Sequence, residues 1–412
     1  MRVLMLGWEF PPYISGGLGV ASEGLVKGLL QLGTEVVLVL PHHPFDSAAP
    51  NLKIVDAHAV REQDDPKHRK RFLLRLRRVP SLLRPYSTDT SYAEEWQTAQ
   101  ETSTTFLGHY GPNLGTEVMR YAEVAGRIAR QERFDVIHAH DWLTYMAGLE
   151  ARRASGRPLV LHVHATEFDR SGGGENRFVS DIERLGLTQA DRVIAVSRYT
   201  AALVTRMYGV PREKLRVVHN AIDPKETVGE WSVEEDDPLV LFAGRITWQK
   251  GPEYFVDAAA RVVQEFSNVK FAVAGSGDRM RSMMERVAAL GIGRNFLFTG
   301  FLPPSELDRL YARADVYVMP SVSEPFGLTA LEALQHGTPV ILSRTAGVSE
   351  VIRNVLLVEP EDVEDLASKI LSVLLFSPLR DALSSSGRAE VRRLSWAEAA
   401  GKCLEIYREI VA

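Results

Sequence analysis

Two cations lie on one short loop between Gly244 and Gly251. Arg245 and Lys250 follow Leu239 to Ala243, an apolar run that predicts a buried strand, and a helix is predicted to begin directly after them. An arginine fork and a mobile lysine suit a diphosphate, because together they neutralise its charge without a metal ion. Two exposed surface cations are the alternative. The position after a strand, with a glycine at each end, favours an anion-binding loop.

Two glutamates follow another predicted strand, Val316 to Met319. Gly327 is predicted to open a helix whose free amides point toward the ligand of Glu324. Glu332 lies about a turn and a half further along that helix, so the two carboxylates are expected to contact different parts of one elongated ligand rather than share a proton. A helix-surface charge is the alternative for Glu332.

Histidines end two neighbouring predicted strands. The first strand ends in the motif His138 to Trp142, which contains Asp141, and the next ends in His162-Val163-His164. Strand alternation places the two histidines of each pair on one face. They could ligate a metal, but no Asp-x-Asp pair accompanies them, so polar contact with a ligand is preferred to metal binding. A buried, hydrogen-bonded histidine is the alternative for one member of each pair.

A glycine-rich turn, Gly16 to Gly19, separates the first predicted strand from the first predicted helix. Glycines let the backbone approach a ligand, and a helix N-terminus favours an anion. The spacing differs from that of the full dinucleotide fingerprint, so a tight turn without a ligand explains the motif almost as well.

Composition bounds the class of protein. The 412 residues are 45% hydrophobic and 25% charged, which is enough apolar material for two or three packed cores. No run approaches the roughly 20 apolar residues of a membrane helix, so we expect a cytoplasmic protein without an integral membrane segment. The net charge of −5 gives no global attraction for nucleic acid.

Two alternations of strands and helices predict an α/β fold with two doubly wound domains. We expect an N-terminal domain over 1–225, a C-terminal domain over 226–394 and a final helix over 395–412, with the acidic stretch Glu230 to Pro238 as linker. Residues 61–117 interrupt the first domain with a less regular segment. It contains the basic run Lys67 to Arg78, in which Leu74 to Arg77 alternate as in a half-exposed strand, and a solvated face is favoured over a lipid-binding patch.

These motifs together resemble the retaining glycosyltransferases of the GT-B fold, of the family 4 type (glycosyl transferases group 1), which include glycogen synthase-like enzymes. The resemblance covers nearly the whole chain and also rests on Val193 to Ser197 and Val217 to Asp223. It implies two Rossmann-like domains facing across a cleft, with a C-terminal helix that crosses back to the N-terminal domain.

The resemblance also implies roles for particular residues. The implied catalytic residues are His164, Arg245, Lys250 and Glu324. The implied donor-binding residues are Gly16, Gly17, Leu302, Phe326, Gly327, Leu328 and Glu332, and the implied acceptor-binding residues are Asp141 and Trp142. No metal and no cofactor is implied.

The implied reaction moves a hexose, with glucose as the first choice, from ADP- or UDP-glucose to an acceptor hydroxyl of a carbohydrate such as an α-glucan. Ile14 stands where the main bacterial and plant glycogen and starch synthases carry a lysine, and Glu332 is a glutamate that they usually lack. These departures place the chain in the broader group. A mannosyl- or other hexosyltransferase, and a non-catalytic nucleotide-sugar or polysaccharide-binding protein, remain alternatives. We expect domain closure on donor binding, because the implied donor and acceptor residues are divided between the domains.

Overall fold

The computed structural model describes residues 1–11, 16–41, 52–57, 114–172, 174–225 and 237–411. They form two compact units, Met1–Asn220 with Trp396–Ala412, and Ala221–Ser395. The predicted boundary at 225/226 falls later than the observed one, and Lys225 forms an ion pair with Asp308 of the second unit. Residues 61–113, with the basic run, and the predicted linker up to residue 236 lie outside the described residues. Residues 114–117, expected to be irregular, begin a helix.

The described part of the first unit contains one parallel sheet with the strand order β3-β2-β1-β4-β5-β6-β7. The central strands are buried along almost their whole length, which is why they read as continuous apolar runs. The strands are β1 Arg2–Leu6, β2 Glu35–Leu40, β3 Leu52–Asp56, β4 Val136–His140, β5 Leu159–Val163, β6 Arg192–Ala195 and β7 Leu215–Val217.

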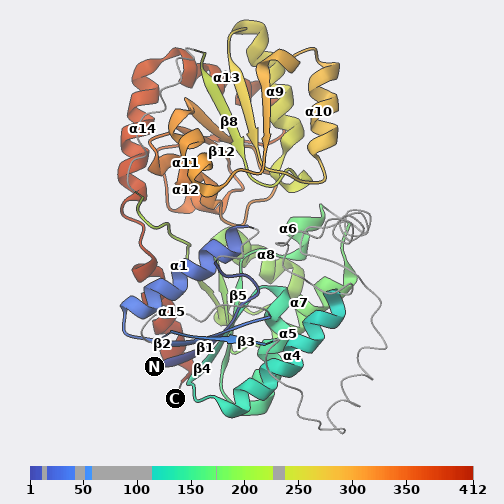
Figure 1. Cartoon of the computed structure of the whole chain (residues 1–412), viewed down its shortest axis with the longest axis vertical. Coiled ribbons are helices and arrows are strands. Elements are labelled where there is room, and N and C mark those ends of the chain that lie inside the picture. Colours follow the sequence, from blue (N-terminus) through green and yellow to red (C-terminus); the bar gives the residue numbers. More distant parts are fainter. Residues whose placement is uncertain (12–15, 42–51, 58–113, 173, 226–236, 412) are drawn as a thin grey trace. The chain divides into compact units, whose positions relative to one another are not determined.

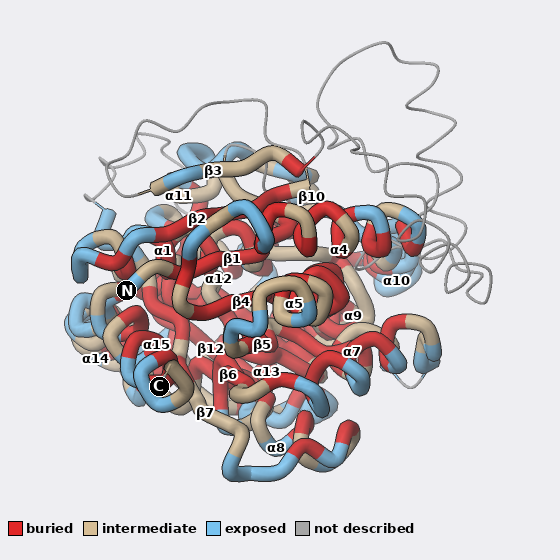
Figure 2. The backbone as a smooth tube through the Cα atoms, turned by 90° about the horizontal axis from the view of Figure 1, so that it is seen from below, coloured by how far each residue is buried: buried red, intermediate tan, exposed pale blue. Residues whose placement is uncertain are grey.

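Helices cover both faces of this sheet (Figures 1 and 2). On one face α4, α5 and α7 pack together, and on the other α1 lies beside α15, the helix nearest the C-terminus. The helices of the unit are α1 Gly17–Gln31, α4 Leu114–Gln131, α5 Trp142–Ser155, α6 Glu167–Ser171, α7 Arg177–Gln189, α8 Arg198–Tyr208 and α15 Trp396–Ile410, with the 3-10 turn η1 Arg212–Lys214.

The contact between α1 and α15 is close enough to require a glycine. A Cβ atom on Gly28 would lie 2.3 Å from the carbonyl oxygen of Trp396. At the other end of α15, Glu409 forms ion pairs with Arg192 and Arg216. The predicted return of the final helix to the N-terminal domain is therefore confirmed, since α15 is part of the first unit.

The second unit has a parallel sheet with the order β10-β9-β8-β11-β12-β13 in its described residues. Its strands are β8 Leu239–Ala243, β9 Lys270–Ala274, β10 Phe296–Gly300, β11 Val316–Met319, β12 Val340–Ser343 and β13 Leu356–Val358. Its helices are α9 Pro252–Glu265, α10 Met280–Ala289, α11 Pro304–Arg313, α12 Leu328–Gln335, α13 Val363–Leu375 and α14 Ser377–Val391, with short 3-10 turns η2 Trp248–Lys250, η3 Gly293–Asn295 and η4 Gly347–Glu350.

Each sheet reverses its strand order once near the middle. The reversal falls between β1 and β4 in the first unit and between β8 and β11 in the second. In open α/β sheets, ligands bind outside the carboxyl ends of the strands at such a reversal. The glycine-rich turn follows β1, the motif His138 to Trp142 spans the end of β4, and the two loops with charged residues follow β8 and β11.

Candidate active site

In the second unit, the loop after β8 is packed against the loop after β11. Gly251 has a φ of 67°, and a Cβ atom there would lie 2.1 Å from the carbonyl oxygen of Pro320. The carbonyl of Gln249 accepts a hydrogen bond from the Val322 amide at 2.9 Å. These backbone contacts bring the adjacent Lys250 to the other loop.

Lys250 forms an ion pair there with Glu324, and the Ser321 hydroxyl donates to the same carboxylate oxygen at 3.3 Å. The lysine side chain is 19% exposed and that of the glutamate 7%. The structure therefore corrects the alternative of two exposed surface cations, because Lys250 is partly buried and held by a buried carboxylate. The two predicted loops meet at one ion pair.

The helix after Glu324 begins as predicted. Gly327 is the N-cap of α12, with a φ of 109° in the left-handed region. The loop ahead of it is held from the side of β12, because the Gly347 amide donates to the Glu324 carbonyl at 2.9 Å and the Val348 amide to that of Phe326 at 2.7 Å. The first turn of α12 thus begins shortly after Glu324, and a Cβ atom on Gly327 would lie 3.3 Å from Cγ of that glutamate.

The second glutamate has its own partners. Glu332 accepts a hydrogen bond from the Tyr311 hydroxyl at 3.1 Å. Burial raises its pKa above the ordinary value, and the positive charge of Lys225 opposes that rise. Because Glu324 and Glu332 contact different groups, the structure agrees with the prediction that they do not share a proton.

The other predicted donor-side residues lie on the same unit. Arg245 and Leu302 are half-buried on the loops after β8 and β10, and Leu328 is half-buried at the start of α12. Phe326 is buried, and its carbonyl already accepts from the Val348 amide.

In the first unit, Asp141 holds the loop after β5. It is the residue other than glycine with a positive φ, 57°, in the described part of the chain. Its carboxylate accepts hydrogen bonds from the amides of His164 at 2.7 Å and Ala165 at 3.3 Å. Burial raises the pKa of Asp141 to about 6, although the positive charge of Arg170 and the two amides oppose the rise. The carboxylate is thus already engaged within the protein.

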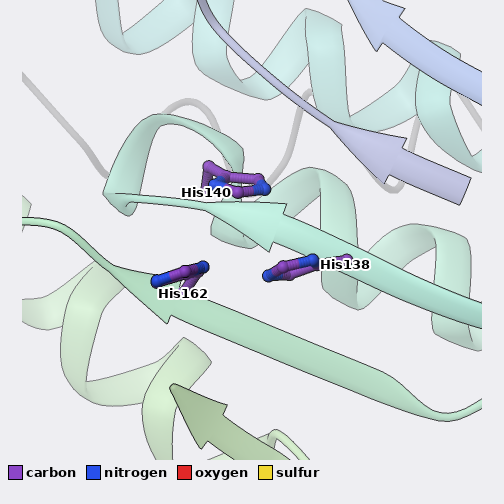
Figure 3. A group of neighbouring side chains, drawn as sticks. All are labelled: His138, His140 and His162. Atoms are coloured by element: carbon purple, nitrogen blue, oxygen red, sulfur yellow. The ribbon is translucent and has the colours of Figure 1, made fainter. Parts of the chain in front are cut away.

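Four imidazoles form a compact group at the ends of β4 and β5. Their ring centroids are 4.4 Å apart within each pair, His138 with His140 and His162 with His164. This agrees with the prediction that the two histidines of each pair lie on one face of the sheet. Figure 3 shows three of the four, with the rings of His138 and His162 nearly edge on in that view and nitrogens facing each other. His164 is half-buried, and the other three are buried.

These histidines are neutral at pH 7. Burial lowers the pKa of His138 and His164 to about 3, and it lowers the pKa of His140 and His162 well below 6.5. Ring nitrogens of His138, His140 and His162 lie within 4.8 Å of one another, and this is the group among the described residues that could hold a metal ion. Neutral imidazoles are the ligands that a zinc-type ion accepts, although this group contains no carboxylate.

The remaining three predicted residues of the first unit differ in exposure. Trp142, predicted to bind an acceptor, is 2% exposed and packs edge-on against Phe178 in the core, so its ring offers almost no surface to a ligand. Gly16 and Gly17 lie at the N-terminus of α1, where Gly17 is exposed and the first amides are free of helical partners.

Sequence reasoning missed Tyr407. Its hydroxyl and Nδ1 of His138 are 2.6 Å apart, although the two residues are 269 positions apart in the chain. It also missed Arg170, which forms buried ion pairs with Glu167 and Glu183 behind the loop that Asp141 holds. No local motif marks either contact, and an arginine on a short helix reads as a surface charge.

Family models match most of the described chain. Residues 225–390 match the model "Glycosyl transferases group 1", and residues 91–226 match "Glycosyltransferase Family 4". An uncharacterized glycosyltransferase of Methanocaldococcus jannaschii is 30% identical, with 99% of this chain and 98% of that protein covered. The glycogen synthase of Mycobacterium tuberculosis is 28% identical, with 91% and 86% covered.

Solved structures show the same architecture. The sucrose-phosphate synthase of Thermosynechococcus elongatus superposes with a TM-score of 0.76 at 22% identity, over 99% of this chain and 98% of that one. HepE of Anabaena, in complex with UDP and glucose, gives a TM-score of 0.69 at 19% identity, over 99% and 100%. The chain therefore belongs to the family 4 (group 1) glycosyltransferases and has the GT-B fold. None of its described helices is both long and apolar enough to cross a membrane.

Proposed function

We propose that this glycosyltransferase moves glucose from UDP- or ADP-glucose to a hydroxyl of an α-glucan, with retention and without a metal or cofactor. The observation that carries the proposal is the Lys250–Glu324 pair at the strand-order reversal of the second sheet. The glycogen synthase relatives support the acceptor, and a structural neighbour crystallised with UDP-glucose supports the donor.

On the second unit, the proposed site handles the donor. The leaving group is a diphosphate, and Lys250, Arg245 and the amides at the start of α12 stabilise its charge as the sugar bond breaks. A phosphate that attracts Lys250 releases the Glu324 carboxylate from its ion pair, and that carboxylate then accepts hydrogen bonds from sugar hydroxyls. Glu332 accepts from the ribose.

The turn that contains Leu302 receives the base, and the backbone of Phe326 and Gly327 with the side chain of Leu328 completes the donor contacts in this proposal. Phe326 and Gly327 lie between β11 and α12, and Leu328 is the first residue of α12. These residues contribute shape complementarity and no charge, so in this proposal the cations and the helix amides provide most of the rate enhancement.

On the first unit, the proposed site contacts the sugar and the acceptor. His164 lies beside the transferred glucose as a neutral hydrogen-bonding group, and the amides of Gly16 and Gly17 approach the phosphates. Asp141 acts on the acceptor side through the loop that it holds, and the core position of Trp142 limits that residue to supporting it. A diphosphate oxygen takes the proton of the attacking hydroxyl.

The test is a transfer assay with UDP-glucose and ADP-glucose as donors and glycogen as acceptor, read by nucleotide release and by glucose added to the glucan. The proposal expects release that depends on glycogen, and an α-linked product by NMR. Turnover of GDP-mannose alone would overturn the glucosyl assignment. Binding of the nucleotide sugars without any release would identify a binding protein instead.

A further inference from the structure

His164 has one hydrogen-bonding neighbour among the buried imidazoles. Its Nε2 lies 2.9 Å from Nδ1 of His140, the last residue of β4. Both rings are neutral, so one nitrogen of this pair carries a proton and the other accepts. The direction of this bond decides which nitrogen of His164 is left for a ligand.

The surroundings of His140 select one direction. Its Nε2 is buried and has no hydrogen-bond partner. If His140 accepted at Nδ1, its own proton would sit on that Nε2 as a buried donor with no acceptor. If His140 donates from Nδ1, Nε2 is only an unused lone pair. Buried donors without partners are the rarer and costlier case, so His140 donates.

We infer that His140 is a positioning residue, which holds His164 as the tautomer protonated at Nδ1 and so presents that N–H to the sugar. The inference rests on the proposed role of His164. His140 acts through His164 and not on the sugar directly, because His140 itself is fully buried.

The ring of His140 is well placed for this role because its position is fixed from several sides. Its carbonyl accepts from the Thr144 hydroxyl at 2.8 Å, and its ring lies 4.4 Å from that of His138, measured between centroids. His138 is in turn bonded to Tyr407 of α15. A side chain locked in this way holds its neighbour without losing further conformational freedom when a ligand binds.

The consequence for catalysis is a neutral donor. An N–H on His164 can hydrogen-bond a sugar oxygen while adding no positive charge to compete with Lys250 and Arg245 for the diphosphate. A His164 protonated at Nε2 would instead direct its N–H back into the protein. The bond from His140 therefore determines whether the sugar receives a donor or an acceptor.

The direct test is nitrogen NMR of the full chain with ¹⁵N-labelled histidine, assigned with His140→Leu and His164→Gln, since protonated and bare imidazole nitrogens have separate shifts. The inference expects His164 to be protonated at Nδ1 in the wild type, and to become a mixture of tautomers in His140→Leu. A wild-type His164 protonated at Nε2 would overturn it. This readout needs no substrate, so it stands even if the transfer assay with UDP-glucose fails.

Kinetics with UDP-glucose test the catalytic consequence. His140→Leu should lower kcat about 10- to 100-fold, and His140→Asn, whose amide N–H lies close to the Nδ1 position, should recover most of that loss. The conservative variant is the control, because it keeps an N–H for His164 in a residue of similar size. Equal losses in His140→Asn and His140→Leu would show a purely structural role.

Discussion

The side chains at the carboxyl edges of the two sheets differ in charge. The carboxyl edge of the first sheet has four imidazoles without charge at neutral pH, and three of them are fully buried. The corresponding edge of the second sheet has a lysine paired with a buried glutamate and the start of a helix. One architecture therefore supports a neutral hydrogen-bonding site in one unit and an ionic site in the other.

This difference matches the two halves of a sugar nucleotide. A diphosphate needs positive charge, and cations on loops at a strand-order reversal provide it. A sugar offers neutral hydroxyls, and neutral imidazoles bond to these without the desolvation cost of a buried charge. The fold sets where each site lies, whereas the residues after four strands set what each site can bind.

The largest expected effect is on the ionic side. Lys250→Ala should lower turnover about 10²- to 10³-fold, because one cation at a developing diphosphate charge is lost. Since the Glu324 carboxylate would be left buried without its partner, the variant should also lose about 1–3 kcal/mol of unfolding free energy. Steady-state kinetics and urea unfolding measure the two effects.

The double variant Lys250→Ala with Glu324→Gln separates them. It removes the unpaired charge, so stability should return toward the wild type while turnover stays low. A Lys250→Ala enzyme with wild-type turnover would show that the ion pair serves the fold alone, and the contrast between the two edges would then have no catalytic meaning.

Lowering the pH should destabilise the fold of the first unit more than that of the second. A histidine whose native pKa lies below its unfolded value of about 6.5 stabilises the fold fully above that value and loses this stability as pH falls toward about 3. Four histidines of the first unit behave in this way. Burial raises the pKa of Asp141 to about 6 and of Glu183 to about 7, and it also raises that of Glu167, so these carboxyls take up protons in the native state and partly offset the loss.

The four histidines outnumber the three opposing carboxyls, so unfolding still takes up protons and the free energy of unfolding falls as the pH drops below 6.5. In the second unit the lowered pKa of His336 and the raised pKa of Glu332 act in opposite directions. Hydrogen exchange of the full chain at pH 7 and pH 5, corrected for the intrinsic pH dependence of amide exchange, should therefore show a larger loss of protection in β4 and β5 than in β8 and β11. An equal loss of protection in both sheets would contradict the difference.

Substituting one glycine in each unit compares how tightly the helices of the two units pack. Gly28→Ala should lower the unfolding free energy by about 1–3 kcal/mol, because the new methyl group meets the backbone carbonyl of Trp396, which cannot move aside. Gly387→Ala in α14 is the matched control, since its methyl group would meet a methyl at the end of Leu334, 2.5 Å away, and that flexible side chain can shift. Urea unfolding compares the two, and equal losses would show that α15 adapts as easily as a side chain.

The smallest expected effect is that of a chelator. EDTA should leave glucose transfer unchanged, because Arg245 and Lys250 neutralise the diphosphate. Loss of activity that magnesium or manganese restores would show that a metal replaces these cations. Loss that only zinc restores would place an essential ion among the imidazoles of His138, His140 and His162.

The strand pattern was predictable because buried parallel strands read as short apolar runs. The helix start at Gly327 was predictable from its glycine and its place after β11. The burial of Trp142 was not, because the motif fixes its position after β4 but not the direction in which its ring packs. The contact between Tyr407 and His138 was equally inaccessible, since it joins distant residues through the packing of α15.

The position of α15 has a consequence for synthesis on the ribosome. Residues 221–395 form the second unit without interruption, whereas the first unit needs residues 396–410 to cover α1. A growing chain therefore emerges with its second unit complete while Gly28 of α1 still lacks its contact with Trp396. Folding of the N-terminal half finishes after that of the half translated later, which reverses the usual order of co-translational folding.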